Sequence, residues 1–396
     1  MTISNISLIA VELENNQVRV FWQDGFRSTF HNIWLRHSPG YPDSKRPTDE
    51  KGRFPSSSVF ITPSQATITV AGNLRLKWNN GRISEHCTSW LRENVYDQDT
   101  LLQKRRTASL WNSESVLKHT EFDFELLCNN DNAVLDMFEH LLDHGVVMLR
   151  QVPTKLNTII EIANWFGHTP TNLYSDDAEQ PCIGNIKIDP SVSVATNMCH
   201  FLGPHTDTCW RQTLSGLVLL HCLKAHPQGG RSIVVDGFAV ASRLRDEDQT
   251  AFDLLSQVPI SFGSKVDNKD DWRVLGRIIS TAADGHLEGI RYNGNSIEQL
   301  ELPSKLIEPV YQALEKFESI LYDRALWWQP MLQPGDLLIL DNHRVLHGRE
   351  AFDPDVAERH LQICAVDRDD FHNNYRRMAK KRGKPDWNLR LSAGVV

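Results

Sequence analysis

The sequence predicts a mainly β protein with flanking helices, made of a small N-terminal β-rich domain and a larger domain built around a small barrel. A pattern of strand, tight turn, strand and short helix occurs twice in the first hundred residues. Further along, two apolar runs at residues 217–220 and 337–340 are typical of buried strands, and a Gln-Pro-Gly-Asp turn precedes the second. A chain of 396 residues is long enough for one large and one small domain.

The N-terminal repeat consists of VRVFWQDGFRSTFHNIWLR from Val18 and LRLKWNNGRISEHCTSWLR from Leu74. Each unit predicts two strands joined at Asp24-Gly25 or Asn80-Gly81, then a short helix containing Trp-Leu-Arg. The matched positions are Trp22, Gly25, Ser28, Trp34, Leu35 and Arg36, which recur as Trp78, Gly81, Ser84, Trp90, Leu91 and Arg92. We expect the repeated Trp side chains to form the core of a domain that spans residues 1–100.

The second domain is expected over residues 120–396, after a polar linker at 93–119. Residues 170–204 show few structure signals, and long loops of this kind are often functional. Apolar spacing predicts further elements. These are helices at 122–142, 156–166, 239–255 and 305–321, and strands at 145–149 and 233–235.

Charge and cysteine content exclude several classes of protein. The 42 basic and 50 acidic residues give no nucleic-acid-binding surface, and the one basic block, 376–382, fits a solvated helix face. Seven Cys without a Cys-x-x-Cys pair indicate reduced thiols and a cytoplasmic location. No stretch resembles a signal peptide or a membrane span, so we expect no membrane partner.

His205-x-Asp207, followed at long distance by His347, is the pattern that indicates chemistry. Two imidazoles and one carboxylate can occupy one face of an Fe(II) ion, leaving positions for a co-substrate and O2. A lone His-x-Asp is a weak signal, because a turn His beside a capping Asp explains it equally well. Here, however, buried strands follow Asp207 and precede His347, so the barrel brings the three side chains together.

Arg359 follows His347 by twelve residues and is the candidate cation for the distal carboxylate of 2-oxoglutarate. A guanidinium can bind a carboxylate through two parallel hydrogen bonds. The hydroxyl of Ser232 is a second candidate donor to the same carboxylate. An ion pair of Arg359 with Asp355 or Glu358 at the surface is the competing interpretation. With the triad, these residues indicate an Fe(II)- and 2-oxoglutarate-dependent dioxygenase.

Several motifs together resemble the γ-butyrobetaine/trimethyllysine hydroxylases, which belong to the taurine-dioxygenase-like superfamily. They are HTDTCWR, LVLLHCL, GGRSIVVDGF, IRYN, QPGDLLILDN and RVLHGRE. The resemblance spans nearly the whole chain. It implies a double-stranded β-helix (jelly-roll) catalytic domain, the roles given above to His205, Asp207, His347 and Arg359, and a homodimer.

The chain departs from that family at its zinc site. The family's N-terminal domain binds structural zinc through three Cys after Trp-Leu-Arg and one His in the second repeat. Here the first Trp-Leu-Arg precedes a stretch without Cys, and Arg82 stands where His is expected. A zinc site needs four N or S ligands, and His37, His86 and Cys87 are too few. We therefore expect no structural zinc.

A second departure concerns the substrate. The family holds trimethylammonium in an aromatic cage, but only Tyr174 matches a cage residue, while Thr196 and Ala365 occupy two other positions. Asn197 and Asn293 lie in segments that match substrate-lining stretches. These features favour hydroxylation of a small zwitterionic acid that carries an amine.

Several alternatives stay open. The cage is replaceable by Trp210, Tyr292 or Trp327, which would restore γ-butyrobetaine as substrate. A trimethylammonium phosphonate is another candidate, with Arg211 or Arg291 against its dianion. Desaturation or ring closure of an amino acid would use the same chemistry. A binding module that keeps the metal without catalysis is the candidate from a different class.

Overall fold

The computed structural model describes residues 6–37, 61–115, 120–170, 181–187, 199–264, 271–384, 391 and 394–395. The chain divides into two compact units between Arg105 and Arg106. Each unit has its own hydrophobic core. None of the helices in the described ranges is both long enough and apolar enough to span a membrane.

The first unit contains the two repeats as two three-stranded antiparallel sheets, each followed by a short helix. The Trp indole of each repeat donates to the Ser six residues later, Trp22 to Ser28 at 2.8 Å and Trp78 to Ser84 at 2.9 Å. Both indoles are buried, as predicted. The elements are β1 (Leu8–Glu14), β2 (Gln17–Trp22), β3 (Arg27–His31), α1 (Asn32–His37), β4 (Pro63–Ile68), β5 (Leu74–Trp78), β6 (Ile83–His86), α2 (Thr88–Glu93) and α3 (Gln98–Gln103).

The second unit is built on two β-sheets. The six-stranded sheet has the order β7 (Glu121–Asp123), β8 (Val146–Arg150), β18 (Leu337–Asp341), β11 (Leu217–Lys224), β20 (His360–Val366) and β9 (Gly184–Lys187). The four-stranded sheet has the order β10 (Leu202–His205), β19 (Val345–Arg349), β12 (Ser232–Asp236) and β17 (Trp327–Trp328). Neighbouring strands are antiparallel apart from the β7–β8 pair. Two hairpins complete the unit, β13 (Ile260–Ser264) with β14 (Trp272–Gly276) and β15 (Ile279–Thr281) with β16 (Leu287–Ile290).

The side chains that point from each sheet toward the other form an apolar cluster between the two sheets. Val218 and Leu338 of the six-stranded sheet share one apolar cluster with Val234 and Val345 of the four-stranded sheet. Because successive side chains of a strand point to opposite faces, the remaining positions face outward. Every second residue of β12, β19 and β20 therefore points between the sheets, where a small ligand can be enclosed.

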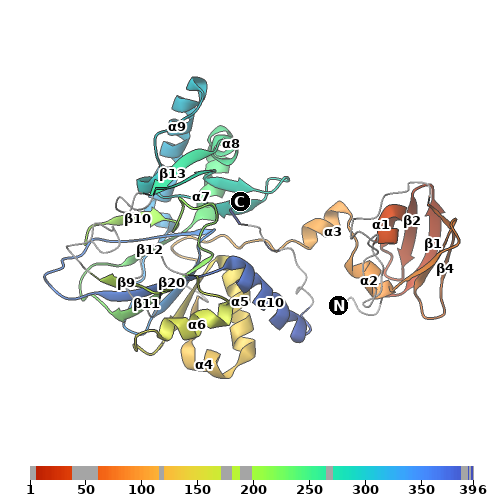
Figure 1. Cartoon of the computed structure of the whole chain (residues 1–396), viewed down its shortest axis with the longest axis horizontal. Coiled ribbons are helices and arrows are strands. Elements are labelled where there is room, and N and C mark those ends of the chain that lie inside the picture. Colours follow the sequence, from red (N-terminus) through yellow and green to blue (C-terminus); the bar gives the residue numbers. More distant parts are fainter. Residues whose placement is uncertain are drawn as a thin grey trace. The chain divides into compact units, whose positions relative to one another are not determined.

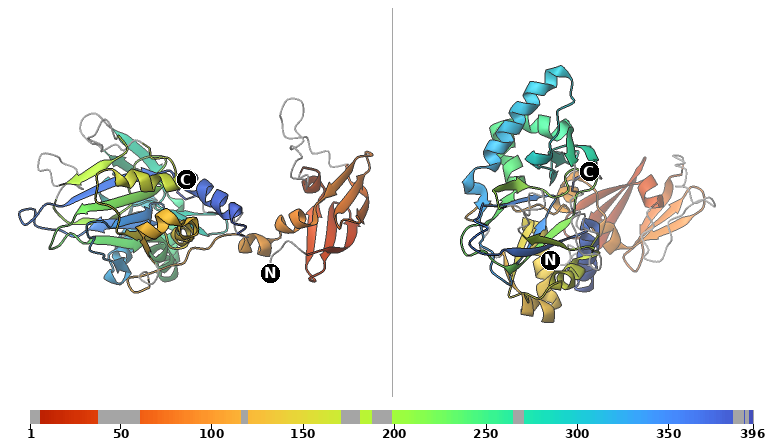
Figure 2. Two further views of the ribbon diagram at one scale, coloured as in Figure 1. Left: turned by 90° about the horizontal axis from the view of Figure 1, so that it is seen from below. Right: turned by 60° about the vertical axis from the view of Figure 1, so that its left-hand side comes forward.

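Helices cover the outer faces of both sheets, as Figure 1 shows. The outer face of the six-stranded sheet packs against α5 (Asp131–His144), α6 (Thr158–Phe166) and α10 (Arg368–Lys381), with α4 (Phe124–Asn129) beside them. That of the four-stranded sheet packs against α7 (Gly237–Glu247), α8 (Gln249–Gln257) and α9 (Ser304–Leu321). The right-hand view of Figure 2 shows the two helix groups at opposite ends of the unit. The prediction of a mainly β protein with flanking helices is confirmed.

The predicted boundaries need correction in three places. Phe122 lies in β7, not in a helix, because residues 121–123 pair with β8 and the Asp123 side chain then caps α4. The rest of the predicted helix 122–142 is two helices, because α4 ends at Asn129 and the Asn130 side chain caps α5. The predicted helix 239–255 is two helices, since Asp248 ends α7 and its carboxylate caps α8 by accepting from Ala251.

The predicted linker, 93–119, is also partly structured. It contains α3, and its residues 106–115 belong to the second unit. Arg106 pairs with Asp143 at 2.7 Å, and the buried Trp111 indole donates to the His144 carbonyl at 2.7 Å. These contacts join distant parts of the sequence, so local polarity did not indicate them.

Candidate metal and co-substrate site

His205 and His347 are brought together by strand pairing. His205 ends β10 and lies opposite His347 of β19 in the antiparallel register. The two ring centroids are 4.6 Å apart. Gly348 allows the strands to approach, because a Cβ at that position would lie 2.4 Å from the Leu202 carbonyl oxygen. The fold therefore fixes two imidazoles side by side.

Asp207 completes the group from the turn that follows β10. Its carboxylate oxygens lie 3.4 Å from Nε2 of His205 and 3.8 Å from Nε2 of His347. One ligand atom from each of the three side chains lies within 4.8 Å of the other two. Within the described ranges, no other group of three His, Cys, Asp or Glu side chains meets this condition. The structure thus brings the three predicted metal ligands together.

The surroundings of the three side chains shift their pKa values in different directions. Nδ1 of His205 donates to the Gly203 carbonyl at 2.9 Å, which leaves Nε2 as the ligand atom. Burial lowers the pKa of His347 to about 4, so this ring is neutral at pH 7. Burial acts to raise the pKa of Asp207, but the neighbouring His347 and His205 side chains outweigh it and lower the pKa. For His205, burial acts to lower the pKa, and Asp207 overcomes it and raises the pKa.

The donor set fits Fe(II). Ligands on one face of an octahedron with bonds near 2.1 Å are roughly 3 Å apart, so the distances around Asp207 need only a small contraction. Nδ1 of His347 is buried and has no hydrogen-bond partner within the described residues. Two imidazoles and one carboxylate with open positions are the ligand set of non-haem iron oxygenases.

Arg359 lies directly before β20 and is buried. Its guanidinium lies 5.7 Å from the Phe352 ring centroid, and burial together with the charge of Arg349 lowers its pKa to about 10. Glu358 pairs instead with Lys224 at 2.7 Å, and no carboxylate pairs with Arg359 in the part of the chain described here. The surface ion pair considered from the sequence is therefore not formed. A buried guanidinium of this kind fits an anionic ligand.

Ser232 begins β12 opposite Arg349 of β19, and both are buried. Strand alternation places both side chains on the inner face with His347. No described hydrogen bond joins Ser232 to Arg359. Arg349 was not assigned a role from the sequence, although its position two residues after His347 on the same strand predicts that it faces inward.

The predicted substrate residues are only partly described. Tyr174 and Asn197 lie outside the described residues, as does Thr196. The Asn293 side chain caps a short 3-10 helix, η5 (Gly294–Ser296), by accepting from the Asn295 amide at 3.0 Å. Ala365 lies opposite Val218 in the β11–β20 pair, on the inner face of the six-stranded sheet.

The three aromatic residues that could replace the cage belong to an apolar cluster other than the one between the sheets. Tyr292, Trp210 and Trp327 are all members of the cluster under α7, α8 and α9. The Tyr292 hydroxyl donates to Glu318 at 2.5 Å, and the Trp327 indole donates to the Leu321 carbonyl at 2.8 Å. Rings held in this way are not available to surround a cation in the site.

The two cations considered for a phosphonate are also engaged. Arg291 donates to the carbonyls of Cys209, Arg211 and Gln212 at 2.5, 2.7 and 2.9 Å. The Arg211 guanidinium lies 5.4 Å from the Trp272 ring centroid. Arg291 therefore anchors the loop after Asp207, and the structure gives no support to the phosphonate alternative.

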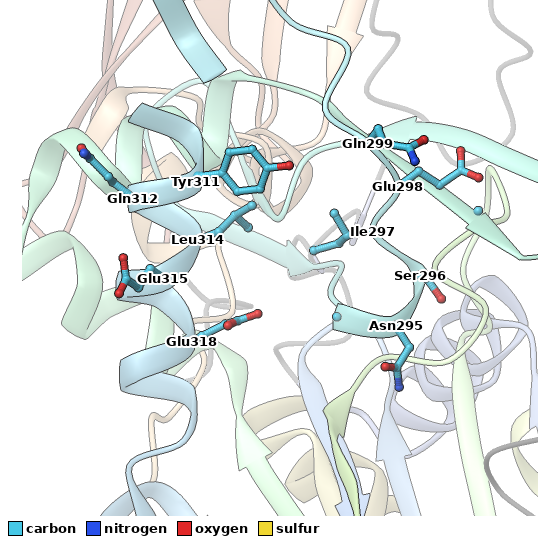
Figure 3. A pocket seen from close by; sticks show the side chains of 12 residues that line it. Asn295, Ser296, Ile297, Glu298, Gln299, Tyr311, Gln312, Leu314, Glu315 and Glu318 are labelled. Carbon is cyan, nitrogen blue, oxygen red and sulfur yellow. The ribbon is translucent and has the colours of Figure 1, made fainter. Parts of the chain in front are cut away.

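A separate pocket of about 900 Å³ lies between α9 and the segment from Gly294 to Gln299 (Figure 3). Glu298, Glu315 and Glu318 give it three carboxylates, and Tyr311 and Leu314 contribute apolar surface. Its lining includes none of the residues of the iron triad. It is not the predicted catalytic site.

Two facing sheets that hold two buried His and one half-buried Asp as a possible ligand set define a non-haem iron oxygenase. The profile of the family described as "Taurine catabolism dioxygenase TauD, TfdA family" matches residues 105–365. The chain belongs to this family. The resemblance noted in the sequence is thereby confirmed.

Curated relatives extend over nearly the whole chain. Gamma-butyrobetaine dioxygenase of Pseudomonas sp. (strain AK-1) is 29% identical over 358 residues, which cover 89% of this chain and 91% of the relative. Mitochondrial trimethyllysine dioxygenase of Gallus gallus is 27% identical over 360 residues, covering 88% and 82%. Among solved structures, a putative alpha-ketoglutarate-dependent taurine dioxygenase from Burkholderia xenovorans has 12% identity and a TM-score of 0.49, covering 60% of this chain and 83% of that one. The chain is a dioxygenase that depends on iron and 2-oxoglutarate.

Proposed function

We propose that His205, Asp207 and His347 hold Fe(II) inside a double-stranded β-helix domain. Arg359 and Ser232 receive the distal carboxylate of 2-oxoglutarate. The enzyme hydroxylates an unactivated C–H bond of a small zwitterionic acid that carries an amine. The first unit is a separate β-rich domain that lacks structural zinc.

The observation that carries this proposal is the closeness of the three ligand atoms, all within 4.8 Å of one another, with the two His on paired strands and Asp207 in the turn that follows β10. With iron bound, such a site couples oxidation of the substrate to decarboxylation of 2-oxoglutarate: the substrate C–H, 2-oxoglutarate and O2 yield C–OH, succinate and CO2. His205 and Asp207 come from one segment and His347 from the strand paired with β10. A set of two His and one carboxylate would hold Fe(II) on one face and leave the other positions for the keto acid and O2.

The protein's own contribution is orientation and exclusion of water. Arg359 is a buried cation without a carboxylate partner among the described residues, and a dicarboxylate supplies that partner. The apolar layer between the sheets, which includes Val218, Val234 and Leu338, keeps the surroundings of the reacting carbon dry.

Two lines of support concern the substrate. The relatives are named for γ-butyrobetaine and trimethyllysine, both small zwitterionic acids that carry a trimethylammonium group. In this chain, however, Ala365 offers no ring on the inner face, while Tyr292, Trp210 and Trp327 pack in the core. A cation held by several ring faces gains on the order of 2 kcal/mol, and most of that is missing here. We therefore propose Tyr174, Asn197 and Asn293 as the substrate-binding residues for a smaller or less methylated amine.

γ-Butyrobetaine itself is the second candidate, supported by the names of the relatives and by Tyr174. Desaturation or ring closure of an amino acid would need the same iron site. The homodimer and the cytoplasmic location are proposed from the resemblance and the cysteine content, and light scattering of the purified protein tests the first.

A mass-spectrometric screen tests the proposed reaction. Purified enzyme with Fe(II), O2 and 2-oxoglutarate is given amino acids and betaines, and Asp207→Ala serves as the matched inactive control. We expect a product 16 mass units heavier than a small amine-bearing acid, with one succinate per product. A loss of 2 mass units would indicate desaturation or ring closure, and γ-butyrobetaine as the best substrate would restore the family's usual preference.

A further inference from the structure

We propose that Asn342 is the positioning residue for Asp207: its side-chain amide holds the main chain of that residue so that the carboxylate faces the two imidazoles. The inference rests on the proposed iron site. Asn342 lies in the turn between β18 and β19 and is fully buried.

Asp207 needs an anchor that the histidines do not. His205 and His347 belong to paired strands, and their backbones are fixed by the β10–β19 register. Asp207 lies beyond the end of β10, and the next residue, Thr208, has a positive φ of 56° that turns the chain away from the strand direction. No ladder therefore fixes the backbone from which the third ligand projects.

The side-chain amide of Asn342 supplies the hydrogen bonds that a neighbouring strand would otherwise make with Asp207. Its Oδ1 accepts from the Asp207 amide at 2.8 Å, and its Nδ2 donates to the Asp207 carbonyl at 3.1 Å. Nδ2 also donates to the Ser215 carbonyl at 3.0 Å. The side chain thus imitates a neighbouring strand, with one acceptor and one donor directed at the same residue. Only a carboxamide supplies one acceptor and two donors in this geometry.

Asn342 connects the segment that carries His205 and Asp207 with the strand that carries His347. Asn342 is five residues before His347, at the corner where the chain passes from the six-stranded to the four-stranded sheet. Its own amide donates to the Gly216 carbonyl at 2.9 Å. The turn that begins the His347 strand therefore also sets the position of Asp207.

Other contacts anchor the neighbours of Asp207 independently. The Thr206 amide donates to the Tyr292 carbonyl at 2.7 Å, and Arg291 holds three carbonyls between residues 209 and 212. A change at Asn342 leaves these anchors in place. Its effect is therefore expected at the metal site more than on the fold of the loop.

Three variants of the full-length chain test the role of Asn342. Asn342→Ala removes all three side-chain hydrogen bonds of Asn342, one from the Asp207 amide and two to the carbonyls of Asp207 and Ser215. Asn342→Asp keeps an acceptor but sets an oxygen against the carbonyls of Asp207 and Ser215. Asn374→Ala is the matched control, because it removes an Asn side chain that donates to a backbone carbonyl, that of Phe166 at 2.9 Å, far from the ligands in sequence.

The readouts are Co(II) affinity, the visible spectrum of bound Co(II), and thermal unfolding. Residues that orient ligands typically contribute about 10- to 100-fold to metal affinity. We expect a loss of this size and an altered spectrum for both Asn342 variants, with the control unchanged. Folded Asn342 variants that bind Co(II) like the wild type, with the same spectrum, overturn the inference.

Asp207→Ala separates this inference from the proposed function. If Asp207→Ala weakens Co(II) binding and the Asn342 variants do not, the iron site stands and the positioning role is wrong. If Asp207→Ala binds like the wild type, the iron site is wrong and the inference falls with it.

Hydrogen exchange of the metal-free wild type needs no variant. The Asp207 amide should exchange slowly because Oδ1 of Asn342 accepts from it. Exchange as fast as that of an unprotected turn amide would contradict the hydrogen bond from the Asp207 amide to Asn342.

Discussion

His205 of β10 and His347 of β19 are direct partners across an antiparallel strand pair, with ring centroids 4.6 Å apart. They are distant in sequence, and their strands approach so closely that a Cβ added at Gly348 would lie 2.4 Å from the Leu202 carbonyl oxygen.

Arg359 should determine the affinity for 2-oxoglutarate. Removing one partner of a buried charge pair costs about 2–5 kcal/mol, so Arg359→Ala should raise the apparent 2-oxoglutarate constant by about 30-fold or more. Initial rates of succinate release at varied 2-oxoglutarate measure it. Arg324→Ala is the control, because that guanidinium also lies 5.7 Å from an aromatic ring centroid, that of Trp327. A change within about threefold for Arg359→Ala would assign the carboxylate to another cation, with Arg349 the first to examine.

Ala365 should limit the use of trimethylammonium substrates. Ala365→Tyr adds an aromatic face on the inner side of β20, where a cation can gain on the order of 1 kcal/mol. The ratio of kcat/KM for γ-butyrobetaine to that for the best amino acid should rise by roughly fivefold. Ala365→Leu is the control, because it adds side-chain volume without an aromatic ring. An equal rise in both variants would show that size, not the ring face, sets the preference.

The N-terminal unit should contain no zinc. His86 is buried, and its Nε2 lies 3.0 Å from the Ser84 hydroxyl, so the second repeat uses this His within its own sheet. Elemental analysis of protein purified without added metal should find no stoichiometric zinc after dialysis against a chelator. One tightly held equivalent would show that ligands beyond His37, His86 and Cys87 complete a site.

His221 should make the fold sensitive to acid. It is fully buried on β11, neither ring nitrogen has a partner within the described ranges, and burial lowers its pKa to about 4. Between pH 6.5 and 4, His221 is protonated in the unfolded chain but not in the folded chain. The free energy of unfolding is therefore highest above pH 6.5 and falls as the pH decreases below it.

Replacing His221 should remove that loss, which is on the order of 3 kcal/mol. Urea unfolding of His221→Leu at pH 7 and pH 4.5 should show a smaller difference than the wild type. His200→Leu, at an exposed position, is the control. An unchanged difference for His221→Leu would mean that other groups cause the acid sensitivity.

The sequence predicted the features that depend on local pattern. The repeat hairpins, the buried runs of β11 and β18, and the approach of His205, Asp207 and His347 follow from alternation, turn residues and ligand types. It did not predict that residues 106–115 pack on the second unit, because Arg106 and Trp111 depend on partners far along the chain. It also gave no role to Asn342, since an Asn in a turn has the same local signature whether or not it holds a distant main chain.

The most direct test of the central claim is metal-dependent turnover in variants of the proposed ligands. Wild-type protein with Fe(II), O2 and an accepted substrate should release succinate from 2-oxoglutarate, whereas Asp207→Ala and His347→Ala should release none above background. Both variants should retain the wild-type circular dichroism spectrum, because the paired strands and the apolar layers do not depend on these side chains. Full succinate release by either folded variant would contradict the assignment of His205, Asp207 and His347 as the iron site.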